Sequence, residues 1–134
     1  MALIVDADVI ICAERGLFDL PAWLESQADE GPQLAAITVA ELWHGLERAT
    51  VSHRARRETY LEMVVEMLPI LPYTASTALQ HARIWAELEA RGKMISYYDL
   101  IVAATALEHG SAVATFNRRH FQNVPGLKVI EPLG

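Results

Sequence analysis

The chain has 134 residues, a length that suits one domain with a sizeable core. Its composition is 52% hydrophobic and 21% charged, with one cysteine, Cys12, which excludes a disordered, collagen-like or disulfide-rich protein. The net charge of −6 argues against a general polyanion binder, so any nucleic-acid partner must be held locally.

The N-terminal apolar run is interrupted by Asp6 and Asp8, which a signal peptide would not tolerate, and no later run approaches the length of a membrane helix. The lone Cys12 fits a reducing compartment. We therefore expect a cytoplasmic protein without membrane association, folded as a single domain over residues 1–134.

The first half of the chain alternates apolar runs with helical patterns. The expected elements are a buried strand over 1–11 that is broken by Asp6 and Asp8, an amphipathic helix over 16–29, a strand over 34–37, and helices over 41–48 and 52–68. Gly31 and Pro32 end the first helix, and Pro69 ends the last. The inner face of the last helix is expected to carry Tyr60, Val64, Met67 and Leu68.

The second half continues the alternation. It predicts a short strand over 70–71, a helix from Thr74 or Ser76 to Arg91, a buried helix over 99–108, a strand over 112–115, a polar loop over 117–126 and an edge strand over 127–130. The apolar stripe of the first of these helices is expected to be Ala78, Ala82, Trp85 and Leu88. Such alternation predicts an α/β fold, with a mostly parallel sheet of about five short strands covered by helices on both faces.

Three acidic residues stand where elements begin or end. Asp6 closes the run Leu3-Ile4-Val5, Glu41 follows the second strand, and Asp99 precedes an apolar helix. In a parallel sheet such positions meet outside the carboxyl ends of the strands, where clustered carboxylates repel unless a cation neutralises them. Hard oxygen ligands, without paired cysteines, favour magnesium or manganese over zinc.

Helix capping is the competing interpretation of two of these acids. Thr38-x-x-Glu41 and Ser96-x-x-Asp99 both match the capping box, and each taken singly is better explained by capping. Asp8 fits a helix cap about as well as a metal role. Asp6 has no such explanation, because a charged group that closes a buried run costs several kcal/mol unless it is paired.

These segments resemble a known family, the PIN-domain ribonucleases, and within it the VapC-type toxins of bacterial toxin–antitoxin pairs. The resemblance covers the whole chain and is carried by four segments in order: IVDADVI from Ile4, TVAEL from Thr38, DLIVAATA from Asp99, and TFNRRHF from Thr115 with Pro125-Gly126-Leu127 after it.

The resemblance implies a PIN-like fold and a magnesium- or manganese-dependent endoribonuclease, in which Asp6, Glu41 and Asp99 bind the metal and catalyse hydrolysis. It also implies an RNA substrate, a cognate antitoxin protein and a homodimer. The chain departs from the family by having Asn117 and His120 in the loop where a fourth acid is usual, which favours one tightly held ion. Asp8 stands where the family usually has Ser, Thr or Asn. The residues that we expect beside the metal or the substrate are Asp8, Thr115, Asn117, Arg118, Arg119 and His120, although ordinary surface hydrogen bonding explains His120 slightly better.

Three basic clusters, at 53–57, 91–93 and 118–119, could guide RNA. Arg118 and Arg119 have the best claim, because their loop follows a strand that should lead to the acidic site. The cluster from Arg54 to Arg57 begins a helix, where positive charge is unfavourable to the helix dipole, which suggests a partner.

Two other functional classes fit part of the pattern. Asp6-x-Asp8 after an apolar strand resembles the nucleophile and acid of haloacid-dehalogenase-like phosphatases, although a later lysine and acidic pair are not evident. A PIN-fold RNA-binding module weakened in catalysis by Asn117 is the other.

Overall fold

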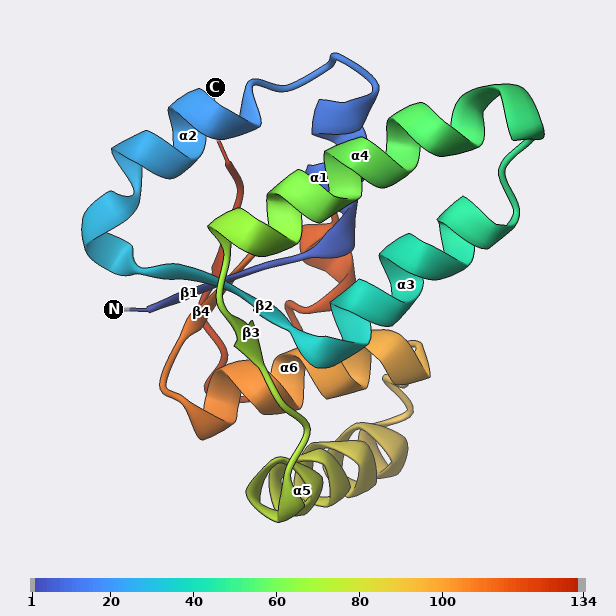
Figure 1. Cartoon of the computed structure of the whole chain (residues 1–134). Helices are drawn as coiled ribbons and strands as arrows, with labels where there is room; N and C mark the ends of the chain where they lie inside the picture. Colours follow the sequence, from blue (N-terminus) through green and yellow to red (C-terminus); the bar gives the residue numbers. More distant parts are fainter. Residues whose placement is uncertain (1, 133–134) are drawn as a thin grey trace.

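The computed structural model describes residues 2–132, which form a five-stranded, wholly parallel sheet between two layers of helices (Figure 1). The strands are β1 (Leu3–Val5), β2 (Pro32–Ala35), β3 (Ile70–Leu71), β4 (Ala112–Ala114) and β5 (Val129–Ile130). Their order across the sheet is β3-β2-β1-β4-β5, so β1 lies at the centre and pairs with β2 and β4. The α/β class and the parallel sheet predicted from the sequence are confirmed.

Six α-helices and two short 3₁₀ turns connect the strands in the described part of the chain. The helices are α1 (Ala7–Glu14), α2 (Leu20–Ser26), α3 (Ala36–Glu47), α4 (Val51–Met67), α5 (Ala75–Arg91) and α6 (Tyr97–Glu108), and the 3₁₀ turns are Ala28–Glu30 and Arg118–His120. In Figure 1, α1, α2 and α4 lie on one side of the sheet, and α5 and α6 lie on the other. No helix within residues 2–132 combines the length and the apolar character needed to span a membrane.

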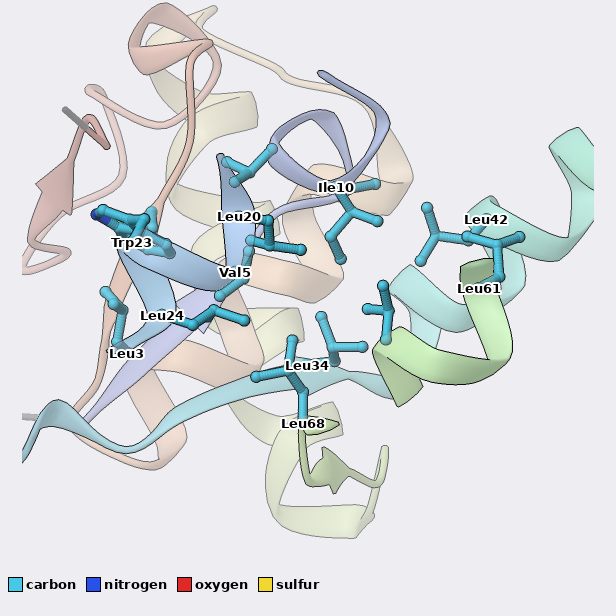
Figure 2. Close-up of a cluster of buried hydrophobic side chains, with 14 of the residues drawn as sticks. Leu3, Val5, Ile10, Leu20, Trp23, Leu24, Leu34, Leu42, Leu61 and Leu68 are labelled. Carbon is cyan, nitrogen blue, oxygen red and sulfur yellow. The ribbon is translucent and has the colours of Figure 1, made fainter. Parts of the chain in front are cut away.

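Two buried clusters hold these layers to the sheet. Successive side chains of a strand point to opposite faces. Leu3 and Val5 therefore join the cluster under α1, α2 and α4, whereas Ile4 joins the cluster under α5 and α6. Figure 2 shows the first cluster, in which Leu34 of β2 faces side chains from four helices. Leu46 and Val64 in this cluster have no exposed surface, so α3 and α4 are anchored firmly beside β2.

The sequence extended several elements too far. The strand expected over 1–11 ends at Val5, because Asp6 caps a helix that begins at Ala7; Met1 lies outside the described residues. The helix expected over 16–29 contains only Leu20–Ser26, since Asp19 caps it and Pro21 lies in its first turn. The strand expected over 34–37 is instead Pro32–Ala35, and the following helix already starts at Ala36. Apolar residues at a helix start look the same as the end of a buried strand, which explains these errors.

Two predicted helix faces were also displaced. The buried side chains of α5 are Thr77, Ile84 and Leu88, whereas Trp85 is 38% exposed, so the stripe through Ala78, Ala82 and Trp85 was wrong. On α4 the buried residues are Leu61 and Val64, with Leu68 at its C-terminal cap; Met67 is exposed and Tyr60 is only partly buried. Elsewhere the sequence was close: Thr74 caps α5, and Gly92, with φ 66°, ends it in the left-handed conformation that favours glycine.

Because all five strands run the same way, their carboxyl ends share one edge of the sheet. Asp6 follows β1 and Thr115 follows β4 at this edge, while α3 leaves from β2 and α6 begins nearby. This edge is where ligand sites form in open parallel sheets.

Candidate active site

Asp6 is the most buried acid of the chain, with 5% of its surface exposed. It is the N-cap of α1: its Oδ1 accepts a hydrogen bond of 2.9 Å from the backbone N–H of Ala7. The Thr115 hydroxyl lies 2.9 Å from its Oδ2, and the Asp6 backbone N–H donates to the carbonyl of Ala114 at 2.9 Å. The Ala7 N–H and the Thr115 hydroxyl therefore fix the carboxylate, and the bond to Ala114 fixes the Asp6 backbone beside β4.

Asp8 joins Asp6 because the first turn of α1 returns its side chain to the strand ends. Its Oδ2 accepts from the Phe116 backbone N–H at 3.0 Å and from the Asn117 side-chain amide at 2.9 Å. The Thr115 hydroxyl lies 3.3 Å from both Asp8 oxygens and also accepts from the Asn117 backbone N–H at 3.0 Å. The sequence placed Asp8 in an extended segment; the helical turn is what brings the two acids together.

Glu41 and Asp99 approach the same edge from α3 and α6. Glu41 Oε1 is buried and has no hydrogen-bond partner within the described residues. Asp99, whose side chain is 14% exposed, lies with its Oδ2 3.2 Å from Nδ1 of His120. The Asp99 backbone N–H is held at 3.1 Å by the hydroxyl of Ser96, the N-cap of α6.

The two capping-box expectations had different outcomes. Ser96 caps α6 as expected, through the Asp99 backbone. Thr38 does not cap α3, because the N-cap is Ala35, which makes no side-chain hydrogen bond. Thr38 is instead buried in the first turn of the helix, and its hydroxyl has no hydrogen-bond partner within the described residues. Capping therefore does not account for Glu41.

Burial raises the pKa of all four carboxyl groups, and the charges of neighbouring acids add to this at Asp6 and Glu41. Burial, followed by the charges of Asp8 and Asp99, raises the pKa of Asp6 from 3.8 to about 7, although bonds from Thr115 and Ala7 oppose this. Burial, Asp99 and Asp8 raise the pKa of Glu41 from 4.5 to about 7. Burial also raises the pKa of Asp8 and of Asp99, against the lowering effect of their hydrogen bonds. Acidic groups that repel in this way create a strong local field for a cation.

The carboxylates do not point at one common atom. Within residues 2–132, no three His, Cys, Asp or Glu side chains are arranged so that they could hold a metal ion as they stand. The hydrogen bonds explain this arrangement. Asp6 uses its two oxygens for Ala7 and Thr115, while Asp99 turns toward His120. Glu41 Oε1 alone is buried and unpartnered.

The loop after β4 brings the remaining predicted residues to this edge. Arg118, Arg119 and His120 form a 3₁₀ turn, are exposed, and line a small cavity of about 260 Å³ with Asn117. The backbone N–H of Phe116, which holds Asp8, was not foreseen, because a main-chain donor has no signature in side-chain identity.

Comparison with known proteins places this arrangement in a family. The model of the PIN domain matches residues 3–127. A ribonuclease VapC from Rickettsia bellii is 32% identical over 131 residues, which covers 97% of this chain and 96% of that protein. The chain belongs to the VapC ribonucleases of the PIN-domain family. The fold and family expected from the sequence are thus confirmed.

Further VapC proteins agree with this assignment. A tRNA(fMet)-specific endonuclease VapC from Salmonella typhimurium is 30% identical over 96 residues, which covers 72% of this chain and 71% of that protein. The crystal structure of VapBC2 from Rickettsia felis, bound to a DNA fragment from its promoter, shares the fold with a TM-score of 0.90 at 22% identity and covers 98% of both chains.

Membership of the VapC family makes this chain a hydrolase of the ribonuclease class and a toxin of the toxin–antitoxin type. The alternative of a haloacid-dehalogenase-like phosphatase is therefore set aside. In this VapC protein, Asp8 accepts hydrogen bonds from the Phe116 backbone N–H and from the Asn117 side-chain amide.

Proposed function

We propose that this single-domain VapC protein is a magnesium- or manganese-dependent endoribonuclease whose metal is held by Asp6, Glu41 and Asp99. The observation that carries the proposal is the buried, unpartnered Oε1 of Glu41. Burial, followed by the charges of Asp99 and Asp8, raises the pKa of Glu41 to about 7. An unpaired buried carboxylate oxygen is costly, and a divalent cation would satisfy it.

The donor set fits such an ion. Its members offer only carboxylate oxygens, which Mg²⁺ and Mn²⁺ prefer, and neither cysteine nor a histidine pair competes. A bound divalent ion would lower the pKa of a water and neutralise charge on the phosphate. To bind such an ion, Asp99 would turn from His120, whose Nδ1 lies 3.2 Å from its Oδ2, while Ser96 also bonds its side chain.

The chain's own residues divide the remaining work. Thr115 and the Ala7 N–H orient the Asp6 carboxylate, and Asn117 and the Phe116 N–H orient Asp8, which supplies negative charge in place of the fourth acid. Glu41 would offer its unpartnered Oε1 to the ion or to a water bound to it. Arg118 and Arg119 are exposed beside the site, where guanidinium groups can grip phosphate oxygens, and exposed His120 lies beside Asp99.

We further propose a cognate antitoxin and a homodimer as partners. The likeness to VapBC2 from Rickettsia felis and to VapBC-5 of the toxin–antitoxin systems from Mycobacterium tuberculosis supports a cognate antitoxin. Exposed apolar side chains, among them Trp85 and Leu79 of α5, offer surface for association.

The decisive experiment measures cleavage of an end-labelled, single-stranded RNA with Mg²⁺, with Mn²⁺ and with EDTA. We expect cleavage only with a divalent ion, and its loss in Asp6→Asn and Asp99→Asn. Asp29→Asn makes the same chemical change at an exposed position outside the site and should cleave normally. Circular dichroism would verify the fold of each variant.

If the two site variants cleaved RNA as well as the unaltered protein does, the assigned site would be contradicted. Binding of RNA by the unaltered protein without any cleavage, across both metals, would instead favour the RNA-binding module with weakened catalysis. Isothermal titration with Mg²⁺ tests the metal site independently of cleavage, because the site variants should lose the binding heat in either case if the carboxylates hold the ion.

A further inference from the structure

A second cleft lies at the far end of α1 and α3 from the acidic edge, with a volume of about 900 Å³. Asp6 caps the N-terminus of α1, and Arg15 of the cleft caps its C-terminus. At a rise of about 1.5 Å per residue, the eight residues of α1 separate the two features by roughly 12 Å. Figure 1 shows α3 and α4 projecting together to one side of the molecule, and the turn between them borders this cleft.

The cleft concentrates positive charge in a protein whose net charge is −6. Four of the 11 lysines and arginines line it: Arg15, Arg48, Arg56 and Arg57. Only Arg57 has a carboxylate partner, Glu14, at 3.1 Å. Within the described residues, the other three form no ion pair with an acid, and the one hydrogen bond of the Arg56 side chain is to Nδ1 of His53, at 3.4 Å.

Helix capping explains part of this cluster but not all of it. Arg15 and Arg48 are the C-cap residues of α1 and α3, where positive charge is favourable. Arg56 lies in the second turn of α4, near the end where the dipole disfavours it. Tyr60 also lines the cleft, and its hydroxyl is buried without a hydrogen-bond partner, a condition that is uncommon in folded proteins.

We propose that this cleft binds phosphate groups of the RNA strand at a distance of a few nucleotides from the bond that is cut. Guanidinium groups without carboxylate partners can grip phosphate oxygens with two hydrogen bonds, and the Tyr60 hydroxyl gains an acceptor. That the strand is the substrate of the acidic site rests on the proposed function.

The family and the charge together favour RNA over an acidic protein segment as the occupant. Both kinds of polyanion would be attracted by the arginines of the cleft. This chain belongs to a family of ribonucleases, so an RNA strand is the polyanion expected at the acidic edge at the other end of α1. An acidic peptide has no comparable reason to reach both ends, and polyglutamate serves as its probe in the test.

The test measures fluorescence anisotropy of a labelled single-stranded RNA in EDTA, where metal-dependent cleavage cannot consume the probe. The variant Arg15→Ala/Arg48→Ala is compared with Arg83→Ala/Lys128→Ala, which removes the same charge at exposed positions of α5 and of the loop before β5. Arg56→Ala, which is not at a helix cap, guards against a folding defect in the first variant.

We expect the cleft double variant to bind RNA on the order of ten-fold more weakly. The slope of log affinity against log salt concentration should fall in magnitude by roughly 1.4, because two phosphate contacts are lost and each contributes about 0.7 in single strands. Arg56→Ala should weaken binding less, and the control should match the unaltered protein. Equal affinities of the cleft variants and the control would overturn the proposal, as would cleft-dependent binding of polyglutamate without binding of RNA. Cleft-dependent RNA binding by a protein that cuts no RNA with Mg²⁺ or Mn²⁺ would support the cleft and contradict the proposed function instead.

Discussion

Glu41→Gln should stabilise this nuclease in the absence of metal, and only above a defined pH. The substitution keeps the shape of the side chain and removes its charge. Because Glu41 Oε1 has no hydrogen-bond partner in the described structure, no bond is lost with it. Burial and the charges of Asp99 and Asp8 raise the pKa of Glu41 from 4.5 to about 7, so the folded state disfavours the carboxylate form.

Proton linkage gives the sign and the size of the effect of Glu41 on the free energy of unfolding. With a folded pKa above the unfolded one, the folded state binds more protons between pH 4.5 and about 7, so the free energy of unfolding falls as the pH rises through that window. A shift from 4.5 to about 7 corresponds to roughly 3 kcal/mol when the group is fully ionised. Solvent screening at this half-buried position reduces the cost to about 1–2 kcal/mol.

The assay is urea denaturation in EDTA at pH 8 and at pH 4.5. At pH 8 the free energy of unfolding of Glu41→Gln should exceed that of the unaltered protein by about 1–2 kcal/mol. The difference should shrink at pH 4.5, where both side chains are largely uncharged in the folded state. Glu66→Gln, the same change at an exposed position of α4, is the matched control and should show no gain. Added Mg²⁺ should stabilise the unaltered protein more than the variant, because only the former keeps all its charged ligands.

Equal stability of the two proteins at pH 8 in EDTA would refute the reasoning. It would mean that Glu41 is well solvated or is paired in solution, and the strongest argument for a cation at this edge would fall with it.

Other substitutions test the surroundings of the site. Asn117→Asp replaces the amide that donates to Asp8 Oδ2 at 2.9 Å with a like charge, so it should lower the free energy of unfolding in EDTA by about 1–2 kcal/mol. The added carboxylate should tighten Mg²⁺ binding in calorimetry, and an unchanged Mg²⁺ affinity would place residue 117 outside the metal's reach. Thr115→Val removes the hydroxyl that bonds Asp6 and should cost about 1–3 kcal/mol in urea denaturation and slow cleavage, while Thr115→Ser should retain both properties. Leu46→Ala opens a fully buried position of α3 and should cost about 2–5 kcal/mol, with cleavage per folded molecule unchanged; a parallel loss of activity would show that α3 packing sets the position of Glu41.

The sequence was most informative where composition changes sharply. The buried helix α6 and the strand before Asp6 were recognisable as apolar runs beside charged residues, and Thr74 and Ser96 act as the helix caps that their spacing indicated. The parallel sheet followed from the alternation of elements, because hydrophobic periodicity is a local property that neighbouring residues set themselves.

The errors arose where the local pattern fits two structures or where tertiary contacts decide the outcome. Asp6 reads as the interruption of a strand, but the 2.9 Å bond to the Ala7 N–H makes it a helix cap. Nothing local to Asp8 indicates that Thr115, Phe116 and Asn117 will surround it. The basic cleft was equally hidden: Arg15 and Arg48 are isolated in sequence, and only the packing of α1 beside α3 brings them near Arg56.

The bond between Thr115 and Asp6 joins residues 109 positions apart, and this has a consequence for how a toxic enzyme is made. The central strand of the sheet is synthesised first, but its neighbour β4 leaves the ribosome only after most of the chain. Long-range pairing of this kind forms late in folding. A nascent or truncated polypeptide that stops before residue 112 therefore lacks the strand that steadies the acidic edge, and we expect translation of this chain to be nearly finished before nuclease activity can arise.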